Sequence, residues 1–280
     1  MLHSFNLYKL GPLHEFPISA TSHSPAALTS LAESLRVFLV RQLALDDAAL
    51  GPQPITRVQA GLVDCTLHGP KHATHVPLLI EVDRAADDDA PTTTSTFVLL
   101  PGSPDSRHAF GVLLARSTPT ALTASMITFL STRFDTLVTP LRLPAPALLS
   151  LLESLVRSRD PDASTPTSLT FAFPPTLATE GLSSLTLTLP PPLVDALAPL
   201  ELDAPHFVRA LDAHFHGLTA LRLADLQLVR MGGGRGTFVH SGHGGAPSDG
   251  AKIKFYRAAA DERELESTLA MIVKVAEKGR

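Results

Sequence analysis

The sequence predicts an α+β fold made mainly of antiparallel β-sheets with helices packed against them. Apolar and polar residues alternate strictly at residues 169–173 and 185–189, which is typical of half-buried antiparallel strands. Between residues 28 and 43, by contrast, apolar residues recur at the spacing of one helix face. The 24 prolines lie mainly between such periodic segments, which favours a fold of many short elements.

The first half, residues 1–157, is predicted to be one α+β region. Ser24 followed by Pro25 is an N-cap with proline at the first helical position, and the helix is expected to run to about Asp46. A second helix is expected after Thr118. A leucine-rich helix at residues 146–156 should be buried on more than one face. Strands are expected at residues 5–10, 55–67, 76–82, 97–100, 109–115 and 137–143.

The second half, residues 168–280, follows a linker at residues 157–168, unless the two halves form one continuous domain. A helix at residues 205–216, closed by Gly217, precedes an alternating segment at 221–230. Because the leucine parity changes within that segment, a bulge or bend is expected near Ala224. Together with residues 237–240 and 252–256, this segment predicts three antiparallel strands with one apolar face. A last helix, beginning with a capping box of Asp261 and Glu264, is expected to cover the C-terminal sheet.

The composition bounds the class of protein. With 44% hydrophobic and 18% charged residues the chain is globular, and its net charge of −4 argues against a freestanding nucleic-acid binder. Residues 222–280 nevertheless carry an excess of basic residues. The single cysteine, Cys65, predicts a reducing compartment and a buried strand position. The sequence has neither a signal-peptide pattern nor an apolar run of about 18 residues, so no membrane span is expected.

No motif predicts chemistry. His214 and His216 are two residues apart on a helix and therefore face different directions, unlike the i, i+4 pair of a helical zinc site. His240 and His243 have no Cys or Glu at ligand spacing, and the aspartates at residues 87–89 are expected in a solvated loop. Glycines at residues 232–236 follow a strand, as in a phosphate loop, but a strand and not a helix is expected next. We therefore predict no enzyme, no cofactor and no metal, and a hairpin turn at the glycines.

Three stretches carry a family resemblance. They are residues 7–16 (LYKLGPLHEF), residues 126–135 (MITFLSTRFD) with Pro140 and Leu141, and a third set made of residues 214–216, 228–230 and 252–254. In order and approximate spacing they resemble the centromere protein L family of the inner kinetochore, across nearly the whole chain. The sequence departs from the family pattern at Gly11, where a small hydroxyl residue is usual, and in an expanded loop at residues 232–250.

The resemblance implies a non-enzymatic subunit of the constitutive centromere-associated network, located in the nucleus at the chromosome's centromere and kinetochore and acting in chromosome segregation. Such proteins form a heterodimer with centromere protein N through C-terminal β-sheets and contact other inner-kinetochore subunits. The pair helps to recognise centromeric nucleosomes and contributes to a basic groove that holds DNA. DNA contact by this chain is therefore expected to depend on the partner.

Residue roles follow from combining the resemblance with the strand pattern. The strands at 221–230 and 252–256 are expected to be edges available for pairing. The expected partner-binding residues are Leu226, Leu228, Arg230, Phe238, Ile253 and Phe255. The expected nucleic-acid contacts, if the strands are neighbours, are Arg222, Arg230, Lys252 and Lys254. An autonomous DNA-binding protein and a small-molecule enzyme using the glycines at 232–236 are the alternatives, and a homodimer of the isolated chain is left open.

Overall fold

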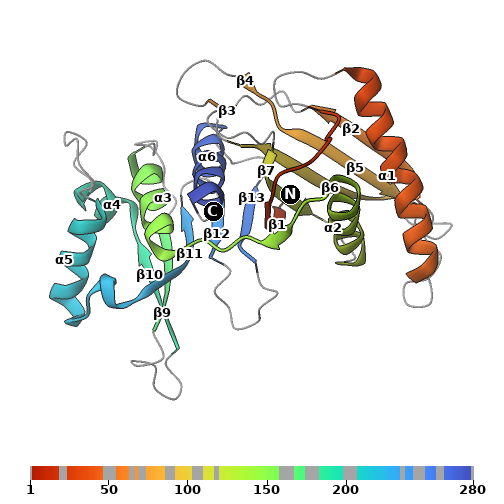
Figure 1. Ribbon diagram of the computed structural model, residues 1–280. Helices are drawn as coiled ribbons and strands as arrows, with labels where there is room; N and C mark the ends of the chain where they lie inside the picture. Colours follow the sequence, from red (N-terminus) through yellow and green to blue (C-terminus); the bar gives the residue numbers. More distant parts are fainter. Residues whose placement is uncertain are drawn as a thin grey trace. The chain divides into compact units, whose positions relative to one another are not determined.

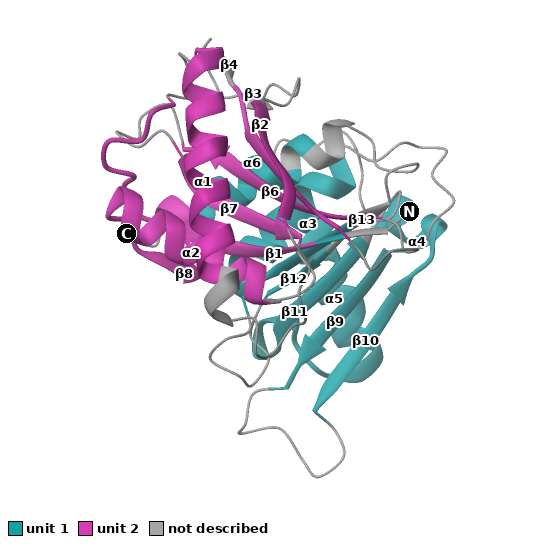
Figure 2. Cartoon of the chain, turned by 90° about the vertical axis from the view of Figure 1, so that its right-hand side faces the viewer, with its two compact units in different colours: residues 1–4, 141–275 teal, residues 5–140, 276–280 magenta. Residues whose placement is uncertain are grey.

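The computed structural model divides the chain into two compact units, coloured in Figure 2. Unit 1 contains Met1–Ser4 and Leu141–Val275, and unit 2 contains Phe5–Pro140 and Ala276–Arg280. The structure describes residues 2–18, 24–46, 55–62, 67–68, 74–85, 92–102, 110–116, 120–157, 167–173, 183–197, 207–233, 237–241, 250–256 and 262–278.

Unit 2 is an antiparallel sheet with two helices (Figure 1). Its strands follow the hydrogen-bonded order β1-β7-β6-β5-β2. The strands are β1 (Leu2–Leu10), β2 (Ile55–Leu62), β5 (Leu78–Arg84), β6 (Thr93–Pro101) and β7 (Phe110–Arg116), with β8 (Val138–Pro140) beside β1 and a separate pair β3 (Leu67–His68) and β4 (Thr74–His75). The helices are α1 (Pro25–Asp46) and α2 (Thr120–Phe134).

The core of unit 2 lies between these helices and one face of the sheet. Helix α1 begins as predicted, because the Ser24 hydroxyl accepts a hydrogen bond from the Ala27 amide at 3.1 Å. Its buried residues repeat every four positions and meet the apolar face of β5 and β6. The members of this core include Leu31, Leu35, Leu39, Ile80, Val82, Phe97, Met126 and Phe129.

The strands of unit 1 are antiparallel and follow the hydrogen-bonded order β10-β9-β11-β12-β13, with β1 next in the strand order. Its strands are β9 (Thr167–Ala172), β10 (Ser184–Leu189), β11 (Gln227–Gly233), β12 (Thr237–His240) and β13 (Lys252–Tyr256). Its helices are α3 (Ala145–Arg157), α4 (Pro191–Leu197), α5 (Phe207–Thr219), the 3₁₀ turn η1 (Leu223–Asp225) and α6 (Glu262–Lys278).

The helices of unit 1 leave one sheet face open. Helix α3 packs against β11 and α5, and Figure 2 shows α3 and α5 behind strands β9 to β12. The buried apolar residues of α3, Leu148, Leu151, Leu152 and Val156, form one stripe, so the prediction that this helix is buried on more than one face was wrong. Helix α6 also buries one stripe along its length. The buried residues of α6 are Thr268, Leu269, Ile272, Val273 and Ala276. The predicted α+β class with mainly antiparallel sheets is confirmed.

Two local predictions in unit 1 were wrong. The segment 221–230 is not one strand, because β11 begins only at Gln227. The bend expected near Ala224 is confirmed as the 3₁₀ turn η1, and a bulge follows between Leu228 and Arg230. Helix α5 does not close at Gly217 but continues to Thr219. It ends at Ala220, whose φ of 60° is left-handed.

The contacts divide the chain at a different place from the expected linker. They separate the units between Pro140 and Leu141, so α3 belongs with the strands that follow it. Several predictions lie outside the described residues: most of the linker, the aspartates at 87–89, Cys65, His243 and the cap at Asp261. None of the described helices is both long and apolar enough to cross a membrane.

Candidate functional site

The open face of the unit 1 sheet is the surface on which the predicted cations meet. Strand register places Thr186, Thr170, Arg230, His240 and Lys252 in one row across five strands. Directly paired residues point to the same side of an antiparallel sheet. Arg230 and Lys252 are exposed, and their backbones are two strands apart, roughly 10 Å. This arrangement puts two of the predicted nucleic-acid residues on one surface.

A second row adds the third cation. Lys254 is opposite Phe238 on β12, and Ser168 and Thr188 continue that row on β9 and β10. We call the two rows, with Ser184 and Gln227, the open face. Its described side chains are hydroxyls, an amide, an imidazole and three cations, and no acidic residue occupies a described position in either row. The described side chains of these two rows therefore give the open face a positive charge, which suits an anionic partner.

Arg222 does not belong to the open face. Its Nη1 lies 3.2 Å from Asp212 Oδ2 on α5, and the Leu223 amide donates to the other oxygen of Asp212 at 2.7 Å. These contacts fix the corner between α5 and η1. The structure thus brings three of the four predicted nucleic-acid residues together and gives Arg222 a different partner.

Of the predicted partner-binding residues, Leu226 lies at the end of η1 and the others are on β11, β12 and β13, and they differ in exposure. Leu226, Leu228 and Ile253 are buried within the chain, whereas Arg230 is exposed. Phe238 and Phe255 lie on β12 and β13, and their side chains are outside the described residues. The three buried residues face the helices, so a substitution there acts first on the core of unit 1.

The prediction that residues 221–230 and 252–256 are edge strands was wrong. Strand β11 pairs with β9 on one side and with β12 on the other. Strand β13 pairs with β12, and the strand order continues from it to the start of β1. The outermost strand of unit 1 is β10, which pairs with β9 alone among the described strands.

The glycine-rich segment joins two paired strands. Gly233 is opposite Thr237, and β12 follows the glycines where a phosphate loop would have a helix. The hairpin prediction is confirmed for the flanking residues; residues 234–236 lie outside the described chain. Within the described residues there is no group of three or more metal-ligating side chains.

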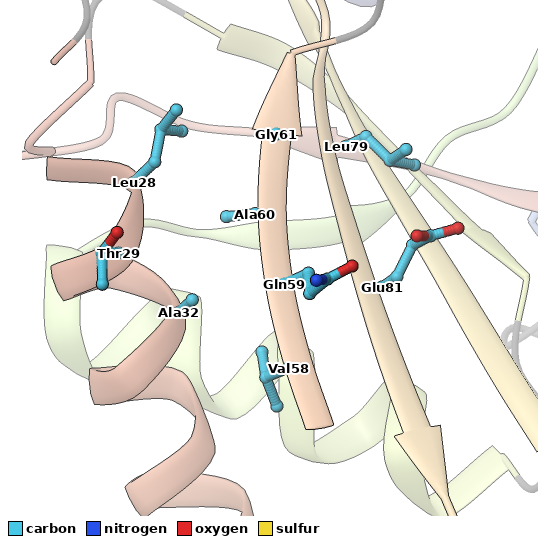
Figure 3. A pocket seen from close by; sticks show the side chains of 9 residues that line it. All are labelled: Leu28, Thr29, Ala32, Val58, Gln59, Ala60, Gly61, Leu79 and Glu81. Atoms are coloured by element: carbon cyan, nitrogen blue, oxygen red, sulfur yellow. The ribbon is translucent and has the colours of Figure 1, made fainter. Parts of the chain in front are cut away.

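A shallow groove of about 370 Å³ lies in unit 2, between the first half of α1 and strand β2 (Figure 3). Thr29 and Ala32 line it from the helix, and Ala60 lines it from the strand. Glu81 on β5 is its one charged lining residue, opposite Gln59 in register. The lining offers no nucleophile with an adjacent base, so the groove does not have the parts of a catalytic site.

Two of the stretches that carry the resemblance contact each other in unit 2. The Gly11 amide donates to the Leu137 carbonyl at 2.8 Å, and the His14 amide donates to the Phe134 carbonyl at 2.9 Å. The Phe16 and Phe134 rings meet edge to face with their centroids 4.7 Å apart. The third set lies on α5, β11 and β13 in unit 1.

The comparison with protein families gives a match to the model described as Centromere protein L, over residues 1–276. The chain belongs to the centromere protein L family. It is therefore a centromere and kinetochore protein of a structural family. The comparison with curated proteins finds no match.

Sequence reasoning missed one part of the open face of this centromere protein L family member. The hydroxyl residues of β9 and β10 continue the cationic rows, and the Thr170 and Thr186 hydroxyls lie 3.4 Å apart. Their strict alternation with leucine was visible in the sequence. Only the strand order, however, reveals that they share a face with Arg230 and Lys252.

Proposed function

We propose that this chain is a non-enzymatic scaffold subunit of the inner kinetochore that forms a heterodimer with a centromere protein N-type subunit. In this role it helps to link centromeric nucleosomes and DNA to the other inner-kinetochore subunits. Membership of the centromere protein L family supports the setting. The observation that supports the pairing is that, among the described strands, β10 at the end of the strand order in unit 1 pairs with β9 alone.

Size-exclusion chromatography with light scattering tests this proposal. The chain is run alone and mixed at micromolar concentration with a candidate centromere protein N. We expect a stable complex of one copy of each, because a free sheet edge supplies backbone hydrogen bonds to an added strand. Separate elution of the two proteins at that concentration would contradict the proposal.

Charged replacements at Leu228 or Ile253 are unsuitable for this experiment. Both side chains are buried, and a buried unpaired charge unfolds the unit whether or not the residue meets a partner. A lost complex would then report lost folding. The partner-contact role of these residues remains a proposal, best tested by conservative changes such as Leu228→Val with folding checked first.

DNA contact is proposed as a secondary role of the open face, acting within the heterodimer. Arg230, Lys252 and Lys254 support it, because cations aligned on one sheet face suit a phosphate backbone. The net charge of −4 disfavours strong binding by the chain alone. Strong salt-dependent binding by the isolated chain would instead favour an autonomous DNA-binding protein.

The test uses fluorescence anisotropy to measure how duplex DNA binding by the heterodimer depends on salt concentration. Replacing Lys252 and Lys254 by Ala should lower the slope of log K against log salt by about 2, since each phosphate contact contributes about 0.9. The matched control replaces Lys274 and Lys278, two exposed lysines of α6, by Ala and removes the same charge. If both variants changed the slope equally, the effect would come from net charge alone, and the open face would not be the DNA-binding surface.

A further inference from the structure

Strand β2 is the outer strand of unit 2, and its helix side is incompletely covered. It pairs with β5 alone among the described strands, so its other edge presents backbone donors and acceptors. Val58 and Ala60 are half-buried, whereas Val82 and Ile80, directly opposite them on β5, are 0% and 1% exposed. Helix α1 therefore covers the apolar side of β5 and leaves that of β2 partly open.

The groove of about 370 Å³ lies along this partly open side. Leu28 and Ala32 of α1 form one wall, and Val58 and Ala60 of β2 form the other. Figure 3 shows Ala60 pointing toward the helix across the groove. All four side chains are half-buried, so apolar side chains placed between the two walls would complete their burial.

The features that protect a sheet edge are confined to the first residues of β2. The register shift lies between Ile55 and Arg57, and Arg57 is directly opposite Asp83. From Val58 to Leu62 the pairing with β5 is regular, and these residues include no charge and no proline. This part of β2 is therefore suited to accept an added strand.

The other face of β2 supplies the charge that selects the added strand. Glu81 lies opposite Gln59 in register and is half-buried, and none of the described side chains forms an ion pair with it. Figure 3 shows Gln59 extending toward Glu81. A strand added to β2 lies two strands from β5, roughly 10 Å, a span that a lysine or arginine side chain can cross. Charge complementarity therefore calls for a basic residue opposite Gln59.

We propose that the edge of β2 and its groove bind an extended, basic peptide segment of another protein by strand addition. Apolar side chains of the segment fill the space between α1 and β2, and a lysine or arginine pairs with Glu81. The two kinds of residue alternate, because successive side chains of a strand face opposite sides of a sheet. This surface belongs to unit 2 and does not rest on the proposed heterodimer.

The first test uses a fluorescein-labelled hexapeptide in which valine alternates with lysine, and a matched peptide with glutamate in place of lysine. Fluorescence anisotropy measures the binding of each to the full chain. We expect the lysine peptide to bind at least about tenfold more tightly, and Glu81→Lys to reverse this preference. Asp225→Lys, which changes the charge equally at an exposed carboxylate of unit 1, should keep the preference. An unchanged preference in Glu81→Lys, or the same reversal in Asp225→Lys, would overturn the proposal.

The second test fills the groove from the helix. Ala32→Phe should weaken binding of the lysine peptide at least about tenfold, whereas Ser30→Phe, on the exposed side of α1, should change it less than about twofold. Equal binding to both variants at unchanged thermal midpoints would place the peptide elsewhere.

Hydrogen–deuterium exchange on the wild-type chain gives an answer that does not depend on a variant folding. The amides of residues 58–62 that do not bond to β5 should become protected when the lysine peptide is added. Binding without this protection would overturn the assignment to β2. Absence of binding by either peptide at millimolar concentration would overturn the proposal as a whole, and the proposed heterodimer would be unaffected.

Discussion

The Glu153 side chain joins two helices of unit 1 through its two oxygens. It accepts the Phe207 amide at 3.2 Å and the Val208 amide at 3.0 Å, so a residue of α3 caps the start of α5. Arg157, one turn further along α3, lies 3.8 Å from the same carboxylate. Because Glu153 is only 9% exposed, water cannot easily replace it at the two amides.

Replacing Glu153 by Ala should lower the free energy of unfolding by about 2–4 kcal/mol, since one buried and one partly buried amide lose a charged acceptor. Glu153→Gln should cost about half as much, because one amide oxygen can still accept. Urea unfolding monitored by circular dichroism measures both changes. The control is Glu33→Ala on α1, whose ion pair with Arg36 is exposed and should matter by less than about 0.5 kcal/mol. A loss at Glu153 no larger than at Glu33 would contradict the capping role.

Single residues of the open face were predictable only in part. Arg230, Lys252 and Lys254 could be grouped from the sequence because they share one alternating pattern, and the register bears this out. The burial of Leu228 and Ile253 follows from the same alternation, yet the sequence could not say whether helices of this chain or another protein cover that face. Arg222 was misplaced because its segment is a turn beside Asp212.

At the scale of an element, helix α5 contains Gly217 within its last turn, whereas the left-handed residue at its C-terminal end is Ala220. Gly217 is inside the helix, and a Cβ added there would meet nothing within 4 Å. Ala220 ends the helix with a φ of 60°, where its amide donates to the His216 carbonyl at 2.9 Å. Glycine is disfavoured inside helices and favoured at a left-handed terminus. Each residue therefore occupies a position that suits the other.

Exchanging the two residues should stabilise unit 1. Gly217→Ala and Ala220→Gly should each raise the free energy of unfolding by about 0.5–1 kcal/mol, the first by helix propensity and the second by relieving left-handed strain. The double variant should gain roughly the sum. Thermal and urea unfolding of the four proteins measure this. The reverse test, Ala220→Val, should be destabilising, and a neutral result there would show that the backbone at residue 220 is not strained.

Elements with a clear period were predictable, and pairing partners were not. The two-residue alternation gave β9 and β10 almost at their observed bounds, and apolar residues at helical spacing gave α1 to its last residue. Which strand lies at an edge depends on strand order, and this order is set by contacts between residues far apart in the chain. The sequence therefore assigned edge positions to β11 and β13, whereas among the described strands β10 ends the strand order of unit 1.

At the scale of the whole molecule, packing places the boundary between the units at residue 141, whereas composition indicated the linker at residues 157–168. The polar, proline-containing linker after residue 157 indicates an exposed connection, but it carries no information about which side α3 packs on. Helix α3 packs against β11 and caps α5, so it belongs to unit 1 although it precedes the linker. The family match, by contrast, was predictable from short stretches because they extend across both units.

Two C-terminal fragments test whether the boundary between the units lies before α3, at residue 141, or after it, at the linker. A fragment of residues 141–280 keeps α3, whereas one of residues 168–280 follows the linker and loses it. Leu148, Leu151, Leu152 and Val156 are buried, and uncovering their contacts costs about 1.5–3 kcal/mol each, which together rivals the whole stability of a typical domain, about 5–15 kcal/mol. We therefore expect a cooperative urea transition from the longer fragment and a broad, non-cooperative one from the shorter. A cooperative transition of residues 168–280 at the same midpoint would mean that α3 is dispensable and that the linker is the true boundary.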